Sequence, residues 1–226
     1  MPDPHLQTAL VSSRICHDLV SPMSSVASAI EILDDQSSDE AMRTLAEDLL
    51  RQGAQKLKAS LMFQRYAFGS MSLSDRVADI HTVKDILDNY AALYAPSLEW
   101  HLEKTDLTYF QTRLLLHMAY IGLHSLPRGG VVKIEIKASG PACTSLILTS
   151  EGPRAILRPD IQAAILQTAP EDGWSARNIH MQICTDIARQ LGGRLEAERQ
   201  TAERVIYKAE DLKNEARQDY SNLVDA

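Results

Sequence analysis

The residues best suited to chemistry in this sequence are His17 and the acid beside it, Asp18. They lie in a helical pattern in which apolar residues recur every three or four positions, as on the buried face of a bundle helix. That face consists of Leu19, Met23, Val26, Ile30 and Leu33. At about 100° per residue, His17 lies about 160° round the helix from Leu19. We therefore expect its imidazole to point into solvent or toward a docked partner.

Two neighbours indicate that His17 is more than a surface histidine. Pro22 lies inside the helical pattern, where it deprives the carbonyl of Asp18 of its backbone donor and bends the axis, at a cost in stability. Asp18 can orient the imidazole and stabilise positive charge that develops on it. An unperturbed histidine has a pKa of about 6.5 and is mostly neutral at pH 7, as a nucleophile must be. The alternative interpretation is a solvated histidine without a role.

The composition limits the partners and the compartment. With 45% hydrophobic and 23% charged residues, the 226-residue chain is typical of a soluble globular protein. Its net charge of -7 argues against nucleic acid as the main partner, and no apolar run is long enough to predict a membrane span. The N-terminus lacks the pattern of a secretory signal. Cys16, Cys143 and Cys184 are scattered, so we expect buried, reduced thiols, a cytoplasmic protein and no metal.

The segment 1–68 is predicted to form a helical hairpin that dimerises. Helical patterns at 6–33 and 39–66 flank a polar break at 34–40, and a short loop favours antiparallel neighbours. Two helices of this length cannot bury their apolar faces against each other alone. Two copies would complete a four-helix bundle, so we predict a homodimer. The alternative is that the hairpin packs on the rest of its own chain.

Beyond a linker at 69–74, the pattern changes to mixed helices and strands over 75–208. Helices are predicted at 75–94, 107–126, 159–167 and 175–190, and strands at 98–102, 131–137, 144–149, 194–198 and 204–208. Together they predict an α/β sandwich with helices on one face of a mostly antiparallel sheet, so the fold class of the whole chain is α+β. The charged segment 209–226 is expected to be a solvated tail or a frayed helix.

This order of elements resembles that of the two-component histidine kinases. His17-Asp18-Leu19 with Pro22 is similar to the phospho-acceptor motif of that family, and the stretch 117–130, HMAYIGLHSLPRGG, follows its helix with two asparagines. The helix that ends at Leu191-Gly192-Gly193 is similar to the family's last helix. The resemblance covers residues 6–208 and implies a dimerisation hairpin followed by an ATP-binding domain of the Bergerat type.

The positions that would bind the nucleotide depart from that family. Ile121 stands where an asparagine coordinates Mg²⁺, which requires oxygen ligands, and His117 replaces the other asparagine. Ser150 stands where the family has its adenine-binding aspartate, and the stretch 176–181 lacks the glycines of a phosphate-binding lid. The resemblance therefore implies a degenerate ATPase-like domain that binds no cofactor. A phosphoryl group on His17 would have to come from another protein.

This combination resembles the dimeric histidine phosphotransferases of the ChpT type, which relay phosphate in the cell-cycle pathway of alphaproteobacteria. The resemblance implies transfer from the receiver domain of a hybrid histidine kinase, through His17, to the receiver domains of response regulators. Asp18 would assist the reaction, and any Mg²⁺ would come with the receiver. Neither a membrane nor a nucleic acid is expected as a partner.

Other residues are candidates for phosphate or receiver contact. Arg14, one turn before His17, could meet phosphate oxygens or be a solvated helix arginine. Ser21, one turn after His17, could line the same surface or fill the kink at Pro22. An apolar patch for the receiver is expected from residues that are more often core: Leu19, Val20, Met62, Phe63 and Met71.

Three other functions stay open on the sequence alone. The first is an autophosphorylating kinase, which would need another Mg²⁺ ligand near Ile121. The second is a dimeric pseudo-kinase adaptor that binds receiver or kinase domains without accepting phosphate. The third is a scaffold with no role in signalling. The pair His17–Asp18 favours transfer, because a pure adaptor has no need of it.

Overall fold

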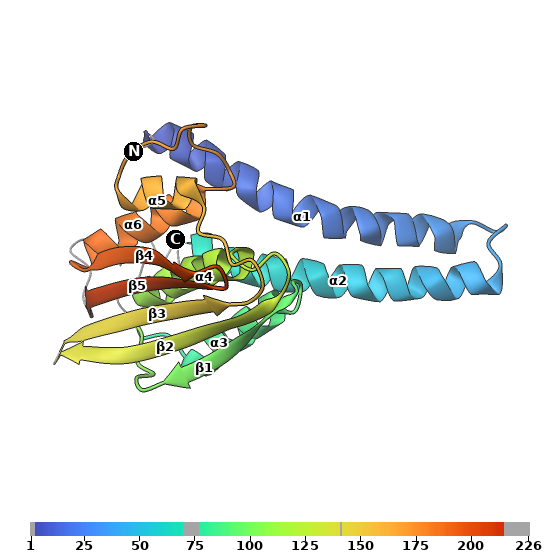
Figure 1. Cartoon of the computed structure of the whole chain (residues 1–226). Coiled ribbons are helices and arrows are strands. Elements are labelled where there is room, and N and C mark those ends of the chain that lie inside the picture. Colours follow the sequence, from blue (N-terminus) through green and yellow to red (C-terminus); the bar gives the residue numbers. More distant parts are fainter. Residues whose placement is uncertain (1–2, 70–76, 141, 215–226) are drawn as a thin grey trace.

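A computed structural model of the protein describes residues 3–69, 77–140 and 142–214. The first of these ranges forms two long antiparallel helices (Figure 1). Helix α1 spans Pro4–Asp34 and α2 spans Glu40–Phe68. Asp3 caps α1 by accepting hydrogen bonds from the first-turn backbone, and Asp39 caps α2 in the same way. The predicted linker at 69–74, apart from Gly69, lies outside the described residues.

An α/β sandwich follows the hairpin. Its strands are β1 (Pro96–Leu102), β2 (Gly130–Gly140), β3 (Cys143–Glu151), β4 (Arg194–Thr201) and β5 (Arg204–Lys213). They form one sheet in the order β1-β2-β3-β5-β4, in which β1 and β2 are parallel and all other pairs are antiparallel. Helices α3 (Ile80–Ala91), α4 (Tyr109–His124), α5 (Pro159–Ile165) and α6 (Ile179–Gln190) cover one face (Figure 1). The predicted α+β class, with its mostly antiparallel sheet, is confirmed.

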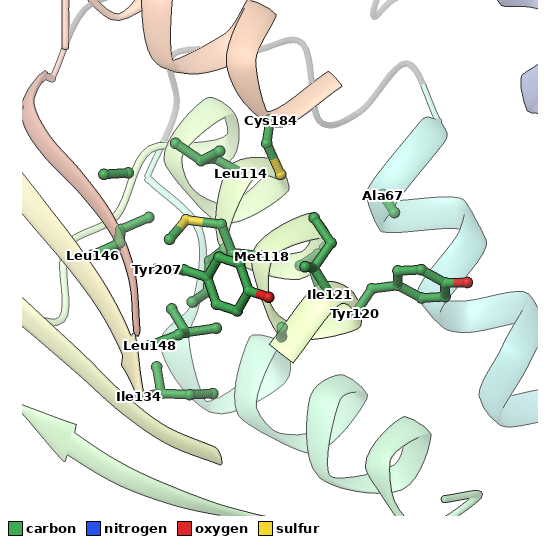
Figure 2. Packing of buried hydrophobic residues seen from close by; sticks show 14 of the residues in the cluster. Ala67, Leu114, Met118, Tyr120, Ile121, Ile134, Leu146, Leu148, Cys184 and Tyr207 are labelled. Carbon is green, nitrogen blue, oxygen red and sulfur yellow. The ribbon is translucent and has the colours of Figure 1, made fainter. Parts of the chain in front are cut away.

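Helix α4 forms the centre of the core. Its side chains are buried on almost every side, because the sheet, α6 and the end of α2 surround it. Figure 2 shows Met118 beside Tyr207 of β5, whereas Tyr120 points away from the sheet toward α2. Cys184 of α6 is buried in this core as expected. Cys143 is only half-buried and Cys16 is exposed, so the prediction of buried thiols is wrong at Cys16 and holds only in part at Cys143.

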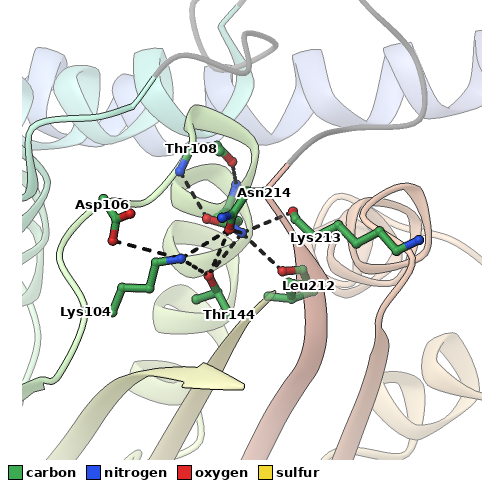
Figure 3. A network of polar contacts seen from close by, with 8 residues as sticks. Lys104, Asp106, Thr108, Thr144, Leu212, Lys213 and Asn214 are labelled. Carbon is green, nitrogen blue, oxygen red and sulfur yellow. Dashed lines mark hydrogen bonds and ion pairs between the residues drawn. The ribbon is translucent and has the colours of Figure 1, made fainter. Parts of the chain in front are cut away.

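The last strand extends beyond the point where the sequence predicts a tail. Residues 209–213 continue β5, which corrects the prediction that a solvated or helical segment begins at 209. The part of the predicted tail from 215 to 226 lies outside the described residues. The Gln111 amide donates hydrogen bonds to the carbonyls of Leu212 and Lys213 and to the Thr144 hydroxyl (Figure 3). The Lys104 ammonium also binds the Thr144 hydroxyl, at 2.9 Å. This network fixes the end of β5 against the first turn of α4.

The hairpin is fixed to the sandwich at one end and projects from it at the other (Figure 1). Phe63 and Ala67, near the end of α2, belong to the main hydrophobic core. The rest of the hairpin leaves large apolar side chains exposed, namely Leu6, Val20, Met23, Ile30, Met42, Leu45 and Leu61. Packing on its own chain therefore covers only part of the apolar surface of the hairpin.

The two helices approach each other closely at Gly53. A Cβ at this position would lie 2.9 Å from Cγ2 of Val26 and 3.3 Å from the carbonyl oxygen of Pro22. We expect Gly53→Leu to force the helices apart and to lower the free energy of unfolding by about 1–3 kcal/mol, as overpacking does. Urea unfolding monitored by circular dichroism measures this change.

The matched control is Ala54→Leu, which adds the same side chain at the next, exposed position of α2. It should change stability by no more than about 0.5 kcal/mol. Equal effects of the two substitutions would contradict a tight crossing at Gly53.

Candidate functional site

The imidazole of His17 stands exposed on the middle of α1. Its side chain is 75% exposed, whereas that of Asp18, the next residue, is 9% exposed. Nδ1 of His17 lies 3.4 Å from Oδ1 of Asp18. Because a carboxylate can only accept, this long contact favours the tautomer with hydrogen on Nδ1. The Nε2 lone pair is then available to a partner that approaches from solvent.

The Asp18 carboxylate is held firmly from two sides. Arg14, four residues earlier on α1, donates from Nε to Oδ2 at 2.9 Å and pairs with Oδ1 through Nη2. Gln64, on α2, donates from Nε2 to Oδ2 at 2.7 Å. Asp18 is therefore a fixed group beside an accessible imidazole. Arg14 and Asp18 are four residues apart, the usual spacing of an ion pair on a helix, so the sequence is sufficient to suggest their contact. No sequence pattern indicates that Gln64, 46 residues later, also binds Asp18.

Arg14 and Phe63 do not lie where the sequence predicted them. Arg14 is 7% exposed and committed to Asp18, with its guanidinium carbon 5.4 Å from the centre of the Tyr120 ring. The alternative of a solvated helix arginine is therefore wrong, and the predicted phosphate contact is disfavoured because the guanidinium is already paired. The prediction that Phe63 contacts a receiver is also wrong. Its ring is buried and stacks on that of Tyr90, with centroids 3.9 Å apart.

The remaining predicted contact residues are at least partly accessible. Val20 and Ser21 are exposed on α1 and Leu19 is half-buried. Met62 is half-buried and lines an open groove of about 650 Å³ between α2 and α3. Met71 lies outside the described residues.

Aromatic and imidazole rings join the hairpin to the sandwich. Tyr120 stacks on His180 with centroids 3.7 Å apart, and Nδ1 of His180 lies 2.8 Å from Nδ1 of His117. Nε2 of His117 lies 2.9 Å from the carbonyl oxygen of Ala67 in α2 and must donate to it. Nδ1 of His117 is then an acceptor, so His180 donates to it. This arrangement requires the His117 ring to be neutral, because its Nδ1 must accept.

Burial is the main reason why these two histidines stay neutral. Loss of water and the nearby Arg113 guanidinium lower the pKa of His117 to about 3. Burial, followed by the proximity of His117 and Arg14, lowers the pKa of His180 well below its ordinary value.

The residues where a histidine kinase would bind ATP and Mg²⁺ do not fit that ligand. His117 is committed to His180 and Ala67, and Ile121 is buried and offers no oxygen. Ile121, Arg177 and His180 are among the residues around a cavity of about 20 Å³ at this place. That volume is close to the space that a single water needs, about 10–15 Å³. Ligand pockets are larger, at about 300–1,000 Å³.

No cluster of three or more His, Cys, Asp or Glu side chains in the described ranges is placed to hold a metal ion. No helix in the same ranges has both the length and the apolar character to cross a bilayer.

Comparisons with known proteins identify the family of this chain. The family model described as the histidine phosphotransferase C-terminal domain matches residues 80–203. The protein phosphotransferase ChpT of Brucella abortus (strain 2308) is 27% identical over 202 residues, which cover 89% of this chain and 94% of that protein. A solved structure of a bacterial phosphotransferase is 25% identical, covers 92% of this chain and 97% of its own, and superposes with a TM-score of 0.79. The chain therefore belongs to the histidine phosphotransferase family.

Proposed function

We propose that this phosphotransferase accepts a phosphoryl group on His17 from the receiver domain of a hybrid histidine kinase and passes it to receiver domains of response regulators. The observation that carries the proposal is the contrast between the two neighbours on α1. His17 is open to a partner, whereas Asp18 is held beside it in a fixed orientation. A nucleophile that must meet a second protein needs this combination of access and orientation.

The chemistry follows from the proposed tautomer. Nε2 of neutral His17 attacks the phosphorus of the receiver's aspartyl phosphate. The N–P bond forms as the P–O bond to the aspartate breaks, and the electron pair leaves with the receiver's carboxylate. Positive charge develops on the imidazole, whose Nδ1–H remains and is stabilised by Asp18. In the second half of the relay, the aspartate of another receiver attacks the phosphohistidine and reverses these bond changes.

We further propose that no step uses ATP bound to this chain. The poor fit of His117, Ile121 and the small cavity beside them to a nucleotide supports this proposal. Phosphoryl transfer depends mostly on positioning and on neutralising charge. The Mg²⁺ that neutralises phosphate charge would be bound by the receiver, and the reaction would take place in the cytoplasm, where the receivers work.

A homodimer would cover the projecting part of the hairpin. The exposed apolar side chains of α1 and α2 include Met23 and Ile30 from the predicted bundle face, together with Leu61. A second hairpin packed on them would complete a four-helix bundle and remove this apolar area from water. The receiver would then contact α1 around His17, where Leu19, Val20 and Ser21 lie, and Met62 on α2.

The test is to follow labelled phosphate from a purified, phosphorylated receiver domain. We expect label to move to this chain, to be lost in acid, as phosphohistidine is, and to map to the peptide that contains His17. A parallel incubation with labelled ATP and Mg²⁺ but no receiver should leave the chain unlabelled. Label from ATP alone would favour a kinase. A receiver that binds but keeps its label would favour an adaptor.

A further inference from the structure

The Asp18 carboxylate has all its acceptor positions in use. An ionised carboxylate offers about four lone-pair sites. Oδ1 accepts from Nη2 of Arg14 and from Nδ1 of His17. Oδ2 accepts from Nε of Arg14 and from Nε2 of Gln64. Three of these contacts come from α1 itself. The contact from Gln64 comes from α2, 46 residues later, and ties the carboxylate to the other helix of the hairpin.

Gln64 makes this bond while part of its own amide lacks a partner. The residue is 3% exposed, and its Oε1 is buried with no hydrogen-bond partner among the described residues. The opposite amide orientation would place Oε1 against the carboxylate, where two acceptors repel each other, so Nε2 must face Asp18. A buried, unpaired carbonyl destabilises a fold. An apolar side chain would suit the packing better, so the amide serves Asp18 and not the core.

The α/β sandwich supports the other side of Asp18. The guanidinium of Arg14 lies over the ring of Tyr120, which belongs to α4 and is itself stacked on His180. Arg14 is thus held between the ring and the carboxylate, and Gln64 approaches from α2. Within the described residues, the His17 imidazole meets Asp18 as its hydrogen-bond partner. The orientation of that imidazole therefore depends on groups of two other helices.

We infer that Gln64 is a positioning residue for phosphoryl transfer. It fixes Asp18 across the hairpin, Asp18 holds Nδ1–H of His17, and Nε2 of His17 is thereby presented to the phosphorus atom of the receiver. This inference rests on the proposed function, because it needs His17 to be the phosphoryl acceptor.

The first test is Gln64→Met, which keeps the size of the side chain but removes the donor. We expect the rate of phosphoryl transfer from a phosphorylated receiver to fall about 10- to 100-fold, as when a supporting hydrogen bond or about 1 Å of alignment is lost. Nitrogen NMR of labelled histidine supplies a readout that a purely structural role would not move. The His17 signal should shift from the Nδ1–H tautomer toward Nε2–H.

The second test is Gln64→Glu, which keeps shape but places a carboxylate against Asp18. Transfer should be slow at pH 8, because the two carboxylates repel each other. The rate relative to wild type should rise toward pH 6, since a proton shared by the pair restores a donor. The groups that face this pair are Arg14 and His17, and both are also present in the wild type used for comparison.

Gln36→Met serves as the matched control, because it makes the same chemical change in the exposed turn of the hairpin. It should transfer at the wild-type rate. If His17→Ala abolishes labelling while both Gln64 variants transfer like wild type with an unchanged tautomer, the inference is wrong and the proposed function stands. If His17→Ala is still labelled, the proposed function itself fails. Should Gln64→Met not fold, the pH profile of Gln64→Glu decides.

Discussion

Replacing His17 with alanine should lower the rate of phosphoryl transfer from a phosphorylated receiver by at least about 1,000-fold, as the loss of a nucleophile does in other group-transfer enzymes. The methyl group of alanine cannot form a bond to phosphorus. Asp18 cannot replace the imidazole, because both its oxygens are already bound to Arg14 and Gln64. The measurement is single-turnover loss of label from the receiver, together with gain of acid-labile label by this chain.

The fold should be unaffected by this substitution. The His17 side chain is 75% exposed and alanine favours helices, so unfolding curves of variant and wild type should nearly coincide. The matched control is His5→Ala, which removes another exposed imidazole from the same helix. We expect it to be labelled at the wild-type rate. Labelling of the His17→Ala protein at a comparable rate would place the acceptor elsewhere.

The order of helices and strands could be predicted because each has a strong local pattern. The end of β5 could not, because its charged residues resemble a solvated tail. Glu210 and Lys213 alternate with buried Ala209 and Leu212, and the alternation is interrupted at Asp211. Asp211 has a φ of 58° and lies at an irregularity in the pairing of β3 with β5. A one-residue bulge of this kind hides the period of two on which strand prediction relies.

The site could be predicted only where its residues share one helix. His17, Asp18 and Arg14 lie within one turn, so their proximity follows from the sequence. Gln64 meets Asp18 only through the register of the hairpin, which is set by side-chain packing between α1 and α2. The burial of Phe63 also depends on packing between elements that are distant in the sequence. The sequence shows that Phe63 is apolar but not that its ring lies against Tyr90 of α3 and Tyr120 of α4, where a partner cannot reach it.

Acidification from pH 7 to pH 5 should destabilise the protein strongly through the buried pair His117 and His180. In the folded state burial lowers the pKa of His117 to about 3 and that of His180 well below its ordinary value. In the unfolded chain each pKa is about 6.5. Below that pH the unfolded state binds more protons, so the free energy of unfolding falls as pH falls, by about 1.4 kcal/mol per pH unit for each histidine.

From pH 7 to pH 5 this amounts to about 2 kcal/mol per histidine, or about 4 kcal/mol for the pair. The measurement is urea unfolding at a series of pH values. His117→Asn should remove about half of this dependence, because one of the two buried imidazoles is gone while the amide can still donate to the carbonyl of Ala67.

Carboxylates contribute equally to the pH dependence of unfolding in wild type and in His117→Asn. The difference between the two plots of unfolding free energy against pH therefore gives the contribution of His117. His101→Asn, at an exposed position on β1, is the control and leaves the buried pair in place. Equal slopes for wild type and His117→Asn would mean that the pair titrates in the folded state. That result would contradict the neutral bond between His117 and His180. It would also contradict the close packing of α4 against α6 at this point, because two charged imidazoles 2.8 Å apart would repel each other and separate.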